Sequence, residues 1–223
     1  MITFYTKLAN LYDKTYLKKD YQKEVLYLKK FIKGSVLDVG CGTGRHLQYL
    51  KDHIRIGLDK SLQLIKLAKQ NNPGIKFLQG DIVNFKINQK FDTIISLFTV
   101  IAYLNSKQLE EAINNLVSHL NSKGILILEP FAEPKTLSLK PWFNSYNSPT
   151  LKFTRYVTLK KIRNIAKLNI QWWVNGNTIK EVQHLSLFKH KHIIKLLNKY
   201  CVKVEYLPPT HLFRYGLFVA RIS

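Results

Sequence analysis

The sequence is poor in cysteine and acidic residues and has no long apolar run. Its two cysteines, Cys41 and Cys201, have no metal-ligand spacing, and a disulfide through Cys41 would block a glycine-rich turn, so we expect reduced thiols. His190 and His192, two apart on a predicted helix, point to different faces, so we predict no metal site. No stretch has the apolar length of a signal peptide or a membrane span. We therefore expect a cytoplasmic protein with no membrane partner.

The chain also has no linker rich in Pro, Gly or Ser and no internal repeat. With 223 residues, of which 46% are hydrophobic, it is long enough to bury one substantial core and short for two. Disordered and solenoid classes are thereby excluded. We expect a single domain over residues 1–223.

Acidic residues are scarce, with 14 Asp and Glu against 35 Lys and Arg, which gives a formal charge of +21. Such a charge invites a nucleic-acid partner through the release of counterions from phosphates. However, the lysines are spread over the whole chain and accompany many Ile and Asn residues, as a compositional bias would also produce. A basic surface without a polyanion partner is therefore favoured, and a nucleic-acid partner stays open. A small anionic substrate would be steered by the same field.

Short apolar runs alternate with helical periods between residues 34 and 130, the region that we expect to bind a cofactor. This alternation predicts an α/β fold, a Rossmann-like, doubly wound and mostly parallel sheet with crossover helices. Strands are expected at 35–40, 54–59, 75–81, 91–98 and 124–130, and helices at 44–52, 61–72 and 106–120. Ser61 is the expected N-cap of the second helix, and Gly124 is expected to close the third.

The two flanks differ from this region. Residues 1–33 predict an N-terminal helical lid, with Tyr21, Val25, Leu28 and Ile32 on one face. Residues 150–188 predict an antiparallel β insertion of three strands, in which Asn175-Gly176 signals a type I′ hairpin. Residues 189–223 predict a helix and two strands that complete the sheet. The insertion should lie over the carboxyl ends of the parallel strands, where open α/β sheets bind ligands.

Three glycines, Gly40, Gly42 and Gly44, follow the first predicted strand in "DVGCGTG", two residues after Asp38. A glycine turn after a strand often holds a diphosphate at a helix N-terminus. Asp38 opposes that ligand, because a carboxylate repels phosphate and attracts an ammonium group, a difference of several kcal/mol at about 4 Å. S-adenosylmethionine fits, with its α-ammonium near Asp38 and its carboxylate on backbone N–H groups near Gly42 and Gly44.

Two more acids end the following strands. Asp59 lies 19 residues after Gly40, where an acid accepts both hydroxyls of a ribose. Asp81 in "GDI" can accept from an adenine amino group while Ile82 packs on the ring. One such acid is more often a cap or a surface charge, but three at successive strand ends are unlikely to be coincidence. The candidate cofactor site also includes three neighbouring positions: Cys41, Lys60 and Leu97.

The motifs "DVGCGTG", "GLDKS" and "GDI" resemble those of the class I S-adenosylmethionine-dependent methyltransferases over roughly residues 34–130. A wider resemblance involves "FYTKLANLYDKTYLKKDY", "FDTIISLFTVIAYL", "LILEPF", "LSLF", "VEYLPP" and "RYGLF". These segments are similar to the nucleotide-sugar N-methyltransferases that dimethylate dTDP-linked aminosugars, of the desosamine and mycaminose type. The resemblance implies S-adenosylmethionine as cofactor and a dTDP-linked aminosugar as substrate.

The resemblance also implies roles for particular side chains. Tyr5 matches a tyrosine near the sugar, Tyr12 and Tyr21 match tyrosines around the cofactor, and Arg214 matches an arginine near the substrate end. Tyr103 stands where some members have a histidine beside the amine. With an ordinary pKa of about 10, Tyr103 is better suited to orienting the amine than to deprotonating it, and solvent can take the proton.

Position alone suggests one further site residue. Glu129 ends the last parallel strand and should face the same rim, where it can pair with an ammonium substrate.

Plainer interpretations stay open for several of these residues. The three N-terminal tyrosines can be the apolar face of a helix, and Arg214 can balance surface acids. Trp172 and Trp173 are more often hairpin core or a dimer surface than a stacking platform, and the added strands with these tryptophans suggest a homodimer.

Two other functions compete. An RNA methyltransferase, or another small-molecule methyltransferase of the same fold, is the alternative, supported by the charge. Amino-directed nucleic-acid enzymes usually carry an N/D-P-P-Y/F-type motif after the fourth strand, where this chain has "SLFTV". The third possibility is a partner protein that keeps the fold without turnover, and the intact acids and glycines count against it.

Overall fold

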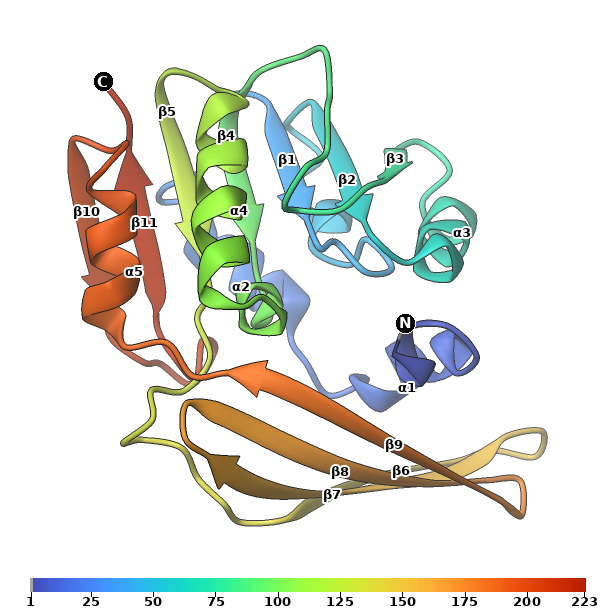
Figure 1. Cartoon of the computed structure of the whole chain (residues 1–223). Coiled ribbons are helices and arrows are strands. Elements are labelled where there is room, and N and C mark those ends of the chain that lie inside the picture. The colour runs from blue at the N-terminus through green and yellow to red at the C-terminus, as the bar shows by residue number, and fades with distance from the viewer. Residues whose placement is uncertain (1) are drawn as a thin grey trace.

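The computed structural model describes residues 2–223, which form two β-sheets joined by helices and loops (Figure 1). The larger sheet has seven strands in the order β10-β11-β5-β4-β1-β2-β3, of which the five from β1 to β5 are parallel. Its strands are β1 (Val36–Val39), β2 (Arg55–Asp59), β3 (Lys76–Gln79), β4 (Phe91–Ser96), β5 (Leu120–Leu128), β10 (Lys203–Leu207) and β11 (Leu217–Arg221). This arrangement confirms the predicted mostly parallel sheet.

The smaller sheet is antiparallel and lies across the carboxyl ends of the parallel strands (Figure 1). It contains β6 (Trp142–Asn147), β7 (Lys152–Ile162), β8 (Ile165–Val174) and β9 (Asn177–Ser186). Asn175 and Gly176 have φ of 45° and 84°, as the predicted type I′ turn between β8 and β9 requires. The prediction of three strands missed β6, because "WFNSYN" is short and half polar.

Three α-helices accompany the larger sheet: α3 (Leu62–Asn71), α4 (Ser106–Ser118) and α5 (His190–Leu197). Ser61 caps α3 as predicted, since its hydroxyl accepts from the N–H of Leu64 at 3.2 Å. Two details were wrong. The helix expected at 44–52 is one short 3₁₀ turn, η3 (Leu47–Tyr49). Gly124 does not close α4, because β5 already begins at Leu120 and Gly124 lies inside it.

The N-terminal region is helical but broken into short pieces: η1 (Thr3–Tyr5), η2 (Ala9–Leu11), α1 (Tyr12–Thr15) and α2 (Tyr21–Leu28). Asp20 starts α2, because its carboxylate accepts the N–H of Lys23 at 3.0 Å. The four residues expected on one apolar face are all buried, with Tyr21, Val25, Leu28 and Ile32 each at most 8% exposed. We call residues 3–28 the N-terminal segment.

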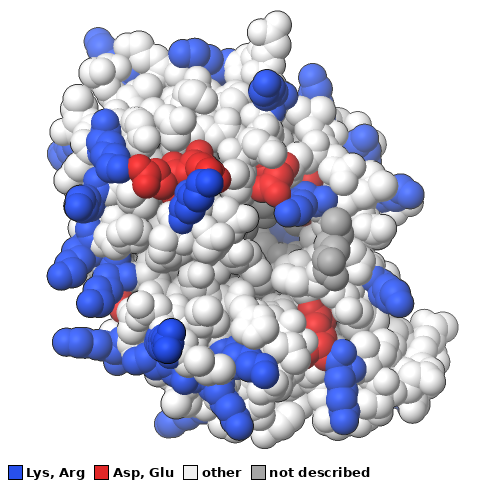
Figure 2. All heavy atoms as spheres, in the orientation of Figure 1, with Lys and Arg blue, Asp and Glu red and all other residues white. Residues whose placement is uncertain are grey.

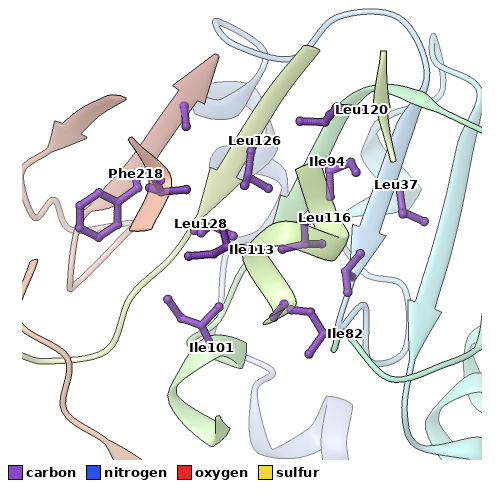
Figure 3. Packing of buried hydrophobic residues seen from close by; sticks show 14 of the residues in the cluster. Leu37, Ile82, Ile94, Ile101, Ile113, Leu116, Leu120, Leu126, Leu128 and Phe218 are labelled. Carbon is purple, nitrogen blue, oxygen red and sulfur yellow. The ribbon is translucent and has the colours of Figure 1, made fainter. Parts of the chain in front are cut away.

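Apolar side chains cover both faces of the larger sheet. On one face, Ile113 and Leu116 of α4 pack on Leu126 and Leu128 of β5 (Figure 3). The other face packs against the N-terminal segment and α3. A third cluster joins Phe4 and Leu11 to the inner face of the four-stranded sheet, and it includes the fully buried Trp172. Within residues 2–223, no helix is both long and apolar enough to cross a membrane.

Candidate functional site

A cavity of about 460 Å³ lies between the carboxyl ends of the parallel strands and the four-stranded sheet. Its walls come from the loops after β1, β2 and β3, from the N-terminal segment, from η4 (Val100–Tyr103) and from β9. Nine residues predicted from the sequence line it: Tyr5, Tyr12, Gly40, Gly42, Asp59, Lys60, Asp81, Ile82 and Tyr103. The structure therefore brings together residues that are up to 98 positions apart.

Asp38 lies beside this cavity, at the end of β1, and is 1% exposed. Its Oδ2 atom has no hydrogen-bond partner among the described residues. Burial, with a contribution from Asp59, raises the pKa of Asp38 from 3.8 to about 8. A nearby cation stabilises the ionised form of a buried carboxyl group that has no other partner. Asp38 also lines a small cavity of about 10 Å³ together with several predicted residues, including Tyr12, Tyr21, Cys41 and Leu97.

The glycine turn requires glycine for two different reasons. Gly40, Gly42 and Gly44 all have positive φ, between 57° and 80°. A Cβ on Gly40 would lie 2.4 Å from a methyl group of Val100 at the cavity wall. A Cβ on Gly44 would lie 2.6 Å from the ring of Phe77. Gly44 is not among the residues that line either of these two cavities, and in the described structure it packs closely against Phe77 behind the turn.

Asp59 is held by the backbone of both loops around it. Its two carboxylate oxygens accept the N–H groups of Gly42 and Ser61, each at 2.8 Å. Burial raises the pKa of Asp59, and these N–H groups oppose that effect. Each oxygen keeps a free lone pair for a further donor, such as a ribose hydroxyl.

Asp81 forms an ion pair with Lys60 at 2.7 Å, and it also accepts the N–H of Val83 at 3.1 Å. Burial works to raise its pKa, but Lys60 and the Val83 N–H outweigh burial and lower it overall. Asp81 is therefore ionised near neutral pH and acts as an acceptor. Lys60, 69% exposed at its side chain, ties the loop after β2 to the loop after β3.

The N-terminal segment is tied to the first loop by polar contacts. Thr43 donates to Asp13 at 2.6 Å, and Glu24 contacts His46 at 2.8 Å. Glu24 also pairs with Lys19. Burial works to raise the pKa of Glu24, yet His46 and Lys19 lower it overall. These contacts hold Tyr12 and Tyr21 beside Asp38 and the glycine turn that follows it.

Three polar side chains meet on the opposite wall of the cavity. The hydroxyls of Tyr5 and Tyr103 are 2.7 Å apart, and Tyr103 donates to Oε1 of Gln183 at 3.0 Å. Burial raises the pKa of both phenols above its usual value of 10. Neither phenol is therefore a base at neutral pH, in keeping with the orienting role expected for Tyr103.

Glu129 and Arg214 lie outside the main cavity. Glu129 accepts the N–H of Phe98 at 2.6 Å, and burial raises its pKa to about 7. Arg214 lines a second cavity of about 190 Å³ together with Tyr215. Burial raises the pKa of Tyr215, and Glu129 adds to this rise while Arg214 opposes it. The pairing of Glu129 with a substrate stays a prediction.

Sequence reasoning missed Phe98 and Gln183. Phe98 lines both the main and the small cavity, with a left-handed φ of 57°. Gln183 was detectable from the alternation in "TIKEVQHLSLF", where polar Glu181 and Gln183 occupy the register of the inward residues Leu185 and Leu187. Buried polar residues inside an apolar register are typical of a functional wall.

The surface charge forms no single stripe on the face that Figure 2 shows. Lys and Arg side chains are scattered around its outline, and several acidic side chains lie beside the central hollow. This distribution favours a generally basic surface over a defined nucleic-acid track on that face.

Comparison with known proteins matches part of the chain to a family. Residues 36–124 match a methyltransferase domain family. This range contains Asp38, Asp59 and Asp81 and the glycine turn between the first two.

Two curated relatives each match more than half of the chain. One is dTDP-3-amino-3,4,6-trideoxy-alpha-D-glucopyranose N,N-dimethyltransferase of Streptomyces venezuelae, 30% identical over 58% of this chain. The other is dTDP-3-amino-3,6-dideoxy-alpha-D-glucopyranose N,N-dimethyltransferase of Streptomyces fradiae, 29% identical over 59% of this chain. The matches span 60% and 56% of the lengths of these two relatives.

The structural likeness extends over nearly the whole chain. The crystal structure of DesVI from Streptomyces venezuelae superposes with a TM-score of 0.89 at 25% identity, covering 96% of this chain and 98% of DesVI. Both sheets are therefore part of a known arrangement.

Proposed function

We propose that this chain, which carries a methyltransferase domain at residues 36–124 on the fold of the S-adenosylmethionine-dependent methyltransferases, methylates the amino group of a dTDP-linked aminosugar. The observation that carries the proposal is the buried Asp38, whose Oδ2 has no partner among the described residues, beside a cavity whose far wall presents phenols. A cationic cofactor would satisfy Asp38, and a substrate amine would satisfy the phenols.

The residues present fit S-adenosylmethionine. The orphaned Oδ2 of Asp38 suits the α-ammonium, and Tyr21, whose hydroxyl also has no partner among the described residues, lines the same small cavity. Asp59 would hold the ribose, with Asp81 and Ile82 at the adenine. When bound, the cofactor supplies an electrophilic methyl group. The side chains around Asp38 would exclude water from the cofactor and fix the orientation of the cofactor.

The acceptor amine would sit at the wall made by Tyr5 and Tyr103. The attacking nitrogen must be neutral, and no phenol here has a pKa low enough to remove its proton. We infer that the two phenols orient the amine and that solvent takes the proton. The chain's contribution to rate is therefore mainly positioning in a water-poor site.

Arg214 would meet the diphosphate of the substrate. Its guanidinium is exposed at the second cavity, where Tyr215, Thr136 and Ser138 supply further donors. A sugar nucleotide would then place its amine at the main cavity and its phosphates at the second cavity. An arginine fork suits phosphate oxygens.

We infer a cytoplasmic homodimer. The outward face of the four-stranded sheet exposes Phe143 by 71%, with Tyr156 directly opposite it and Trp173 also exposed, each by 39%. Aromatic residues grouped on one face are typical of protein interfaces. Light scattering should give twice the chain's 26.0 kDa, and a monomer at micromolar concentration would refute this assembly.

The test is a transfer assay with S-adenosylmethionine labelled in its methyl group. The acceptors are dTDP-3-amino-3,4,6-trideoxy-α-D-glucopyranose, the same sugar nucleotide with a hydroxyl in place of the amine, and total RNA. Label should enter the first acceptor alone, and the rate should change little between 50 and 200 mM salt. Label in RNA alone, with a loss on the order of 10³-fold over that salt range, would establish the alternative.

A further inference from the structure

Two polar side chains of β9, Glu181 and Gln183, continue the contacts of the cavity phenols into the four-stranded sheet. Tyr103 donates to Oε1 of Gln183 at 3.0 Å, and Nε2 of Gln183 donates to Oε1 of Glu181 at 2.8 Å. The second oxygen of Glu181 accepts the N–H of Phe4 at 3.1 Å. Glu181 and Gln183 are 8% and 3% exposed. The chain of contacts therefore runs from the cavity to a buried carboxylate.

The carboxylate sets the direction of every bond in this chain. An ionised Glu181 can only accept, so Gln183 must turn its NH₂ group toward Glu181 and its carbonyl oxygen toward Tyr103. A phenol has a single O–H donor, and Tyr103 uses it in the hydrogen bond to Gln183. The contact between Tyr5 and Tyr103 must then have Tyr5 as its donor.

Three groups around Glu181 favour its ionised form. Burial raises the pKa of Glu181 overall, and Gln183, the Phe4 N–H and the charge of Arg155 each limit that rise. Arg155 of β7 is 5% exposed, and its guanidinium lies over the rings of Phe4 and Trp172, at 5.3 Å from each centroid. The charge of this buried cation, on the second strand from β9, therefore favours the ionised form of Glu181.

We infer that Gln183 and Glu181 are positioning residues that fix Tyr5 and Tyr103 as hydrogen-bond acceptors toward the substrate amine. The O–H groups of both phenols are already used in these hydrogen bonds. The phenols can therefore offer only oxygen lone pairs to the cavity that they line. Two acceptor oxygens 2.7 Å apart can hold the N–H groups of a neutral amine. Its lone pair is then free for the methyl group. This inference rests on the proposed function.

The decisive variants are Gln183→Leu and Gln183→Glu. Leucine removes the acceptor for Tyr103, so kcat on dTDP-3-amino-3,4,6-trideoxy-α-D-glucopyranose should fall about 10- to 100-fold. The Kd of S-adenosylmethionine, measured by calorimetry, should stay within about twofold, because Asp38, Asp59 and Asp81 lie on the other sheet.

The Q183E variant gives a signature that a merely structural role would not produce. Its new carboxyl group would contact Glu181, and two carboxyl groups in contact share a proton, so one of their pKa values rises. With that proton bound, the new group keeps the original direction, with a carbonyl toward Tyr103 and an O–H toward Glu181. The Q183E variant should therefore regain activity as pH is lowered from 8 to 6, relative to the wild type at each pH. The matched control, Lys180→Gln on the outward face of β9, should follow the wild type.

Two results would overturn the inference: wild-type kcat in Q183L, or a Q183E profile that parallels the wild type from pH 6 to 8. If the wild type binds S-adenosylmethionine but methylates no aminosugar, the proposed function fails. Crystal structures of wild type and Q183L then decide the inference. A Tyr5–Tyr103 pair in the same place and at the same distance in both would overturn it, and displaced phenols would support it.

Discussion

The seven-stranded sheet brings acids to the cavity from the ends of its strands, whereas the four-stranded sheet brings Gln183 to it from the middle of β9. Asp38 and Asp59 stand at or near the ends of β1 and β2. Their positions follow from topology, because parallel strands end at one edge. Gln183 reaches the cavity through the register of an antiparallel sheet. The first arrangement suits a cofactor that many proteins share, and the second suits one particular acceptor.

Replacing Asp38 by Asn should give the largest effect on ligand binding. The amide keeps the shape and removes the charge, so the Kd of S-adenosylmethionine should rise about 100-fold or more. The cofactor affinity of Q183L should hardly change by comparison. Calorimetric titration of both variants checks this contrast between the two sheets.

The same Asp38→Asn substitution should stabilise the ligand-free protein. Because folding raises the pKa of Asp38 from 3.8 to about 8, the folded state binds this proton more tightly than the unfolded state does. The stability of the wild type therefore falls as pH rises from 3.8 to about 8. The asparagine variant has no carboxyl group to titrate, so its stability does not fall for this reason. We expect a gain of about 4 kcal/mol in the free energy of unfolding at pH 7. Urea titration at pH 5 and pH 7 should show a smaller gain at pH 5.

Two glycines with nearly equal φ, one beside each sheet, allow the effect of close packing to be separated from that of backbone strain. Gly40 and Gly176 have φ of 80° and 84°, but a Cβ meets Val100 at 2.4 Å in the first and open space in the second. Gly176→Ala should cost about 1 kcal/mol of stability, through backbone strain alone. Gly40→Ala should cost about 3 kcal/mol and abolish cofactor binding. Equal losses in thermal unfolding would show that the first turn is not closely packed.

The sequence allowed the larger sheet to be predicted well and the smaller one in part. Strands β1 to β5 are short apolar runs, a pattern that predicts buried parallel strands. In the smaller sheet, the Asn175-Gly176 pair predicts the turn between β8 and β9. The N-terminal segment was harder, because the apolar period of Tyr21 to Ile32 does not reveal the breaks before α2. Tertiary packing on the four-stranded sheet decides those breaks.

The candidate site divides in the same way. Asp38, Asp59 and Asp81 could be found because each lies at or near the end of a recognisable strand. Gln183 could not be placed opposite Tyr103 without the register between β8 and β9 and the crossing of β9 over η4, which are long-range pairings. Arg214 was predicted near the substrate end; it lines the second cavity, and its contact with the substrate stays a prediction.

Arg214 gives the smallest effect expected here. Arg214→Gln should raise the KM for the dTDP-aminosugar about 10-fold and leave kcat within about twofold, because the guanidinium would act on the phosphates and not on the amine. A variant at Lys203, a cation exposed on β10 and outside all three cavities, is the matched control. A fall in kcat without a change in KM would place Arg214 nearer to the chemistry than this account does.

The central claim is that Asp38 meets the cationic end of the cofactor, and proton release on binding tests it most directly. With a pKa of about 8, the free carboxyl group is mostly protonated at pH 7, and a bound ammonium would ionise it. Calorimetry of S-adenosylmethionine binding at pH 7, in buffers of different ionisation enthalpy, should show release of about one proton by the wild type and none by Asp38→Asn. Binding without proton release, at an affinity that the asparagine variant shares, would contradict the account.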